Sequence, residues 1–184
     1  EHSTLLGLSF KHKKSIYSNY DFSILSGKAD YTGYRHQLNA LAQKSGYEII
    51  FNSSLLNTDS EVNNTQFIRY LAGITKSISK IKLGFENELE QNEWKSNETD
   101  SILNNSFSFT SYRIYVENAD STINQYSLSY KLRNDFLPYN NDLKKSTTAE
   151  DFQLGFSLLK NPSSILKSVV NYRRLEVQDT NIIQ

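Results

Sequence analysis

The sequence predicts an all-β fold, an antiparallel up-and-down meander of about ten long strands. Polar and apolar residues alternate through most of the chain, as they do in strands whose two faces meet different surroundings. Twelve Tyr and ten Phe against only two Pro favour strands over helices or disorder. Breaks rich in Lys, Ser, Asn and Gly separate the alternating segments. With 184 residues, the chain has the length of a single domain, so we expect residues 1–184 to form one unit.

The first five segments carry apolar residues at every second position. The third, residues 34 to 44, also fits a short helical face through Leu38, Leu41 and Ala42, but its place among strands favours the extended form. The residues that share a face are, in order, Leu6/Leu8/Phe10, Tyr20/Phe22/Ile24, His36/Leu38/Ala40/Ala42, Tyr47/Ile49/Phe51/Leu55 and Ile68/Tyr70/Ala72/Ile74.

Among the last five segments, residues 81 to 89, 126 to 136 and 151 to 158 alternate most cleanly. In residues 106 to 117 the apolar positions change parity, which predicts a β-bulge near Thr110-Ser111. Residues 164 to 177 are apolar on both faces, a pattern typical of a strand covered on both sides.

The breaks between segments alternate in length. Tight turns at one end of a meander and long loops at the other are typical of transmembrane β-barrels. Each segment, at ~10 to 14 residues, could cross a bilayer when tilted, whereas no window approaches the ~18 apolar residues of a membrane helix. We therefore expect a transmembrane β-barrel, or a segment of a larger one. The short breaks are residues 12–15, 44–46, 77–80, 118–121 and 160–163, and the long ones are residues 27–33, 57–64, 95–105 and 138–151.

Alternation then divides the side chains between lipid and an aqueous lumen. The lumen charges are of mixed sign, which favours ion-pair ladders or contact with a plug or protein cargo over an ion-selective constriction. A simpler alternative is that these charges only keep the inner wall hydrated. The lipid-facing candidates are Leu83, Phe85, Leu128, Tyr130, Leu132, Leu154 and Phe156, and the lumen-facing candidates are Arg69, Lys82, Glu86, Glu88, Lys131, Arg133 and Asp135.

Aromatic residues gather near both ends of the expected strands, where membrane barrels carry interfacial belts. A soluble sheet would also place some of them there by chance. The belt near the short breaks contains Phe10, Tyr17, Tyr20, Tyr47, Tyr115 and Tyr126, and the belt near the long breaks contains Tyr31, Tyr34, Trp94, Phe107, Phe136, Tyr139 and Phe152.

The short first break places both chain ends on the long-loop side, whereas a complete barrel ordinarily begins and ends on the other side. An open sheet in lipid would leave edge groups unpaired at several kcal/mol each. We therefore expect consecutive strands of a wider wall, completed by further strands or protein subunits.

Stretches rich in Asn, Ser, Tyr and Lys, such as residues 104–109 and 171–175, resemble the large outer-membrane β-barrel proteins of Bacteroidetes. The resemblance is one of pattern and covers nearly the whole chain. Such proteins import nutrients, export cargo or help to assemble other barrels. The resemblance therefore implies a bacterial outer-membrane location, with lipid as a partner.

Little in the sequence indicates catalysis. Twenty acidic and twenty basic residues cancel, so no field favours nucleic acid as a partner. No cysteine is present, and His2, His12 and His36 are not at metal-ligand spacing. Glu86 with Glu88, and Asp30 with His36, are the weak acid–base candidates. We expect no catalytic residue, cofactor or metal.

The leading hypothesis is an outer-membrane barrel, or barrel segment, that acts as a passage or scaffold for solutes or protein partners. The alternative is a soluble β-sheet protein of the periplasm or cell surface that binds glycan or protein through exposed aromatic residues. Alternating strands fit both, since an antiparallel sheet can hide one face and hydrate the other.

Overall fold

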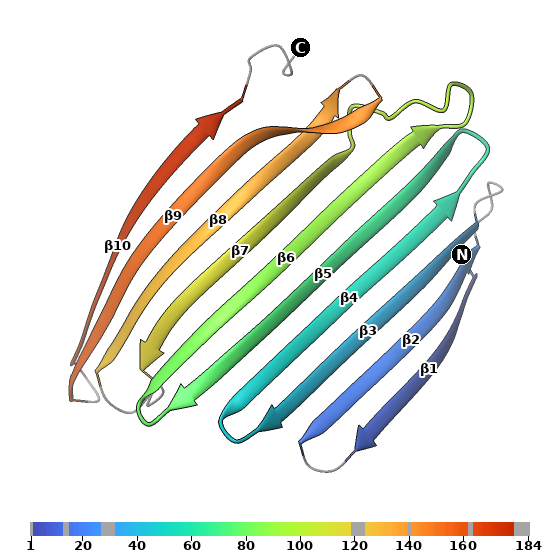
Figure 1. Ribbon diagram of the computed structural model, residues 1–184. Coiled ribbons are helices and arrows are strands. Elements are labelled where there is room, and N and C mark those ends of the chain that lie inside the picture. Colours follow the sequence, from blue (N-terminus) through green and yellow to red (C-terminus); the bar gives the residue numbers. More distant parts are fainter. Residues whose placement is uncertain are drawn as a thin grey trace.

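The computed structural model describes residues 2–12, 15–26, 32–118, 124–139, 141–161 and 164–178. They form one antiparallel sheet of ten strands in chain order, which confirms the meander and the extended form of residues 34 to 44 (Figure 1). The strands are β1 (His2–His12), β2 (Ile16–Ser26), β3 (Thr32–Lys44), β4 (Tyr47–Asp59), β5 (Asn63–Ile78), β6 (Ile81–Ser96), β7 (Phe107–Asn118), β8 (Gln125–Tyr139), β9 (Asp142–Asn161) and β10 (Ser164–Val177). β1 and β10 are the two edges, so the described strands do not close into a barrel.

A two-residue turn, Ser45-Gly46, joins β3 to β4. Both residues have positive φ, 51° and 76°, which is the backbone of a type I′ turn and matches the twist of the flanking strands. A Cβ on Gly46 would lie 2.8 Å from the carbonyl oxygen of Ser77, so the next hairpin also requires glycine here.

Two of the expected long breaks are mostly strand. β4 continues to Asp59, and β8 runs through Pro138 to Tyr139, which pairs with Asp142. The predicted long breaks over residues 57–64 and 138–151 are therefore wrong, since three residues join β4 to β5 and two join β8 to β9. These residues are polar on both faces, and polar hairpins can extend the ladder where water reaches both sides. Residues 97–106, between β6 and β7, do form a long connection.

The bulge expected at Thr110-Ser111 is also wrong, because β7 pairs with both neighbours without a shift there. Instead, Asp135 pairs with Thr147 and Phe136 with Lys145, so Ser146 is the extra residue. A second shift lies beside the β9–β10 turn.

The faces of the sheet follow from the register, because directly paired residues share a face. One row of pairs crosses from β2 to β10, and we call its side the apolar face and the other side the polar face. The row contains Ile16, Ala42, Ile49, Ile74, Phe85, Ile114, Tyr130, Phe152 and Tyr172. On β3 to β5 the polar face is mixed and also carries the half-buried Leu41, Ile50, Leu56, Phe67 and Leu71.

The same row shows how strongly the strands are staggered. Ile16 is the first residue of β2, whereas Tyr172 lies well inside β10, which begins at Ser164. The offset is roughly one residue per strand. We define the line of turns as the line through the connections at one end of the sheet, from β1–β2 to β9–β10. With ~3.3 Å of rise per residue and ~4.8 Å between strands, the strands tilt by about 35° from the perpendicular to this line. Figure 1 shows the strands running obliquely to that line.

A hydrophobic core is nearly absent from the described part of the chain. Ala149 is its one buried hydrophobic residue. The accessible surface is 12775 Å², whereas a compact monomer of 184 residues would expose roughly 9,000 Å². The expectation that residues 164 to 177 are covered on both sides is wrong, since Val169 and Val170 are 56% and 58% exposed on opposite faces of edge strand β10. The described residues include no helix able to span a membrane.

Candidate functional site

The apolar face carries a band of exposed and half-buried hydrophobic side chains. On β6 it runs from Ile81 through Leu83 and Phe85 to the half-buried Leu89, with Asn87 between the last two. Equivalent positions extend it across the sheet, and on β9 and β10 it ends at the Glu150–Arg174 ion pair. We call this zone the apolar band. The side chains project from a single layer, and no second layer of described residues covers them.

All seven predicted lipid-facing residues lie on the apolar face, and all seven predicted lumen-facing residues lie on the polar face. The register thus places the two sets on opposite faces of the sheet. That one set contacts lipid and the other a lumen remains a prediction.

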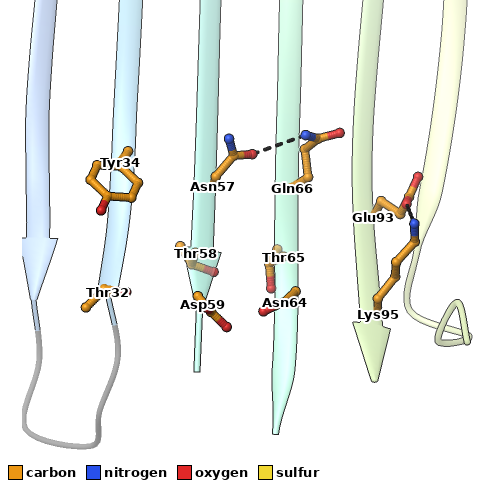
Figure 2. Close-up of a pocket in the computed structure, with 10 residues that line it drawn as sticks. All are labelled: Thr32, Tyr34, Asn57, Thr58, Asp59, Asn64, Thr65, Gln66, Glu93 and Lys95. Atoms are coloured by element: carbon orange, nitrogen blue, oxygen red, sulfur yellow. Dashed lines mark hydrogen bonds and ion pairs between the residues drawn. The ribbon is translucent and has the colours of Figure 1, made fainter. Parts of the chain in front are cut away.

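Beyond the apolar band, towards the β4–β5 and β6–β7 connections, the apolar face becomes polar. We call this zone the polar crest, formed by Thr32, Tyr34, Asn57, Asp59, Asn64, Gln66, Glu93 and Lys95. With Thr58 and Thr65 these residues line a shallow hollow of about 340 Å³ (Figure 2).

Short polar contacts order the crest. Gln66 Nε2 donates to Asn57 Oδ1 at 3.2 Å, and Lys95 Nζ lies 3.1 Å from Glu93 Oε1 (Figure 2). The hydrogen bond with Glu93 and the charge of its carboxylate raise the pKa of Lys95, which lies beyond the apolar band. The crest is therefore a hydrated surface that offers amide, hydroxyl and charged groups.

The polar face carries a ladder of ion pairs between adjacent strands. Arg69 of β5 contacts Glu88 at 3.2 Å and Glu90 at 3.5 Å on β6. Arg113 of β7 contacts Glu86 at 3.3 Å. Lys82–Glu117 and Arg173–Asp151 are further pairs between strands on this face, and Arg133–Asp135 is a pair within β8. Of the predicted lumen-facing charges, Lys131 alone lacks an ion pair to another described residue.

Sequence reasoning missed a glycine–tyrosine contact at the centre of this ladder. The ring of Tyr115 lies over Gly84, its directly paired residue, and a Cβ at Gly84 would collide with Tyr115 Cζ. The guanidinium of Arg113 lies 4.7 Å from the centre of the same ring. The signal was available, since a glycine within an otherwise regular strand often marks a close approach of another group.

The residues of the predicted aromatic belts are divided between the two faces of the sheet. Phe10, Tyr20, Tyr47 and Tyr126 lie on the apolar face within a few residues of a tight turn. The prediction that Phe152 lies near a strand end is wrong, because this residue is in the middle of β9. The residues that instead belong to the polar face are Tyr17, Trp94, Phe107 and Tyr115, and Tyr31 lies outside the described residues.

Phe107 and Phe109 explain why the bulge was misplaced. Both remain on the polar face, where the guanidinium of Arg133 lies 4.0 Å from the ring centre of Phe109. A cation–π contact makes an aromatic side chain compatible with a charged surface. Hydrophobicity alone therefore assigned the wrong face.

The weak acid–base candidates do not assemble a reactive pair. Glu86 and Glu88 are engaged by arginines. His36 lies on the apolar face, where its Nδ1 is hydrogen bonded to the Tyr20 hydroxyl at 2.6 Å. Asp30 and the side chains of His2 and His12 lie outside what the structure describes. The described residues contain no group of three His, Cys, Asp or Glu placed to hold a metal.

No protein-family model matches the chain, and a search of curated proteins finds no match either.

Proposed function

We propose that this chain is part of the wall of a transmembrane β-barrel in a bacterial outer membrane, where it serves as a passage or scaffold for solutes or protein partners without catalysis. The observation that carries the proposal is the apolar band, exposed on one face of all ten strands while the opposite face carries an ion-pair ladder. In a bilayer this band would meet acyl chains, and the ladder would meet the water of a lumen.

The exposed band is difficult to reconcile with an isolated chain in water. Soluble monomers rarely expose contiguous apolar patches larger than a few hundred Å². Here the large exposed hydrophobic residues extend from Leu6 on β1 to Tyr172 on β10. Burial against lipid would remove that surface from water without requiring a core within the chain.

The tilt of the strands supports the same proposal. The tilt of about 35° lies within the range of membrane barrels. The apolar band stays beside the tight turns from strand to strand, and the polar crest projects beyond it. A bilayer parallel to the line of turns would thus cover the band and leave the crest in water.

The unpaired edges imply partners. β1 and β10 each have one side without a neighbouring strand among the described residues. In hydrocarbon such edges would be prohibitive, because water cannot satisfy the exposed backbone groups. Further strands or protein subunits would pair with them. The sequence pattern shared with large Bacteroidetes barrels agrees with a wider wall.

A soluble periplasmic or surface protein that binds glycan or protein is the alternative. Exposed aromatic residues such as Tyr47, Tyr126 and Tyr172 favour it, since these side chains are frequent in binding surfaces. In that case a partner protein would have to cover the apolar band. Purification as a single monodisperse species without detergent or refolding would support this alternative.

Neighbouring positions on β9 provide a direct test. The chain contains no cysteine, so Leu154→Cys and Gln153→Cys each introduce a unique attachment point on opposite faces. A fluorophore at position 154 should be quenched by brominated acyl chains after reconstitution of the full-length protein. A fluorophore at position 153 should instead be quenched by aqueous iodide. Equal quenching at both positions would contradict the membrane proposal.

A further inference from the structure

A single row of charged residues crosses the polar face from β6 to β10. Following direct pairs, the row contains Glu86, Arg113, Lys131, Asp151 and Arg173. Two cations, Arg113 and Lys131, are therefore directly opposite each other on adjacent strands. Like charges in this position destabilise a sheet unless something neutral or opposite in charge lies between them.

Both acids in this row are already paired with its two arginines. Glu86 faces Arg113 at 3.3 Å, and the Asp151 carboxylate accepts from Arg173 Nε at 2.5 Å and from Nη2 at 3.0 Å. Although Lys131 is also paired directly with Asp151 on the strand ladder, no carboxylate of a described residue lies within 4 Å of its Nζ. The row thus holds one more cation than it holds acids.

The surplus charge lies in a hollow. A depression of about 530 Å³ on the polar face is lined by Arg113, Lys131, Arg173 and Asp151, so three cations face one acid. Ser129, Gln153 and Asn171 also line it, together with Phe152 and Tyr172, which the register assigns to the apolar face. The Gln153 and Asn171 side chains form no hydrogen bond with another described residue, which leaves their amide groups available to a ligand.

We propose that this hollow binds an anionic ligand through a carboxylate or phosphate group held by Lys131. An anion there would neutralise the Arg113–Lys131 repulsion and accept charge-assisted hydrogen bonds from the ammonium group. Amide donors beside it would complete the ligand's shell. The inference rests on the proposed function for placing the hollow in a lumen, and it deepens that function by giving the solute or partner a negative charge.

The test uses the full-length protein in detergent and compares the wild type with Lys131→Gln and Lys167→Gln. Lys167 is a matched control, because it lies on the polar face of β10, outside this hollow, and has no ion pair to a described residue. Thermal unfolding is followed with inorganic phosphate or citrate, each compared with sodium chloride at equal ionic strength. Glucose serves as the neutral probe.

Phosphate and citrate should each stabilise the wild type and Lys167→Gln relative to chloride. Lys131→Gln should weaken the apparent affinity by about tenfold or more, as expected for loss of one charge-assisted hydrogen bond. Without anion, Lys131→Gln should change the stability little, since it removes both a like-charge contact with Arg113 and an opposite-charge contact with Asp151. A merely structural lysine would destabilise the sheet when replaced.

The proposal is overturned if chloride stabilises as much as phosphate and citrate do, or if Lys131→Gln keeps the wild-type response. These outcomes are distinct from failure of the membrane proposal. Loss of the anion response with lipid quenching intact at position 154 would refute this inference alone. A detergent-independent protein that still requires Lys131 for anion binding would refute only the membrane location.

Discussion

The two faces of β6 to β8 share one backbone yet have opposite chemistry. Leu83 on the apolar face is 41% exposed, and the side chain of Arg113 on the polar face is 39% exposed. Both side chains are therefore open to the surroundings of their face. On one face the charged side chains are paired across strands, whereas on the other the hydrophobic side chains are covered by nothing that the structure describes. Such a difference is stable only if the faces meet different surroundings.

The largest expected effect comes from placing a charge on each face in turn. Leu128→Arg places a guanidinium in the apolar band, and near a bilayer midplane this should cost about 2–4 kcal/mol of folding free energy. Ser127→Arg, one residue away, faces Glu117 on the neighbouring strand and should be nearly neutral. Urea unfolding in lipid vesicles measures both. Equal losses would remove the distinction between the faces.

A smaller effect is expected from packing on the polar face. Gly84→Ala should destabilise the protein by about 1–2 kcal/mol, because the new methyl group must displace the Tyr115 ring. In a Tyr115→Ala background the same change should be nearly neutral, which a double-mutant cycle would detect. If the losses of stability from the two substitutions were additive, the position of the Tyr115 ring would not depend on the absence of a side chain at Gly84.

The ion-pair ladder should contribute less again. Glu86→Gln removes the partner of Arg113 and leaves that cation opposite Lys131, at an expected cost of up to about 1 kcal/mol, because both side chains of the pair are partly exposed. The loss should shrink at high ionic strength, since salt screens solvent-exposed charges. Unfolding of both proteins at low and high salt would show whether water reaches this face.

The smallest effect is predicted where the apolar band ends. Gln91 lies on the same face as Leu83 but beyond Leu89, at the start of the polar zone. Gln91→Arg should cost about 0–1 kcal/mol, the range for arginine near a membrane interface. A cost as large as that of Leu128→Arg would mean that the band extends farther than the sequence pattern indicates.

Local pattern predicted much of this fold. Alternation in residues 81 to 89 and 126 to 136 assigned both faces of β6 and β8 correctly, since a period of two fixes the face once a strand is identified. It also separated all fourteen candidate residues between the two faces. The medium that each face contacts cannot be read from alternation, which is the same for lipid and for a soluble core.

The predictions of breaks and bulges were wrong where the polarity of a side chain does not depend on the face of the sheet that carries it. Residues 138–151 resembled a loop because neither side of that hairpin is apolar, although its strands continue to Tyr139 and from Asp142. Phe109 led to the wrong prediction of a bulge because its cation partner, Arg133, lies on another strand and is not evident from the local sequence. The direct pairing of Arg113 with Lys131 could not be predicted from the sequence either, since it depends on the register between β7 and β8.

The constant stagger of the strands has a consequence for how wide such a wall can be. Because each strand is offset from the last by roughly one residue, the slope is set within each hairpin and does not depend on how many hairpins are joined. In the proposed barrel, hairpins of this design could be gained or lost two strands at a time, which would change the bore while the hydrophobic thickness stays the same. Gene duplication could then widen such a barrel without changing its fit to the bilayer.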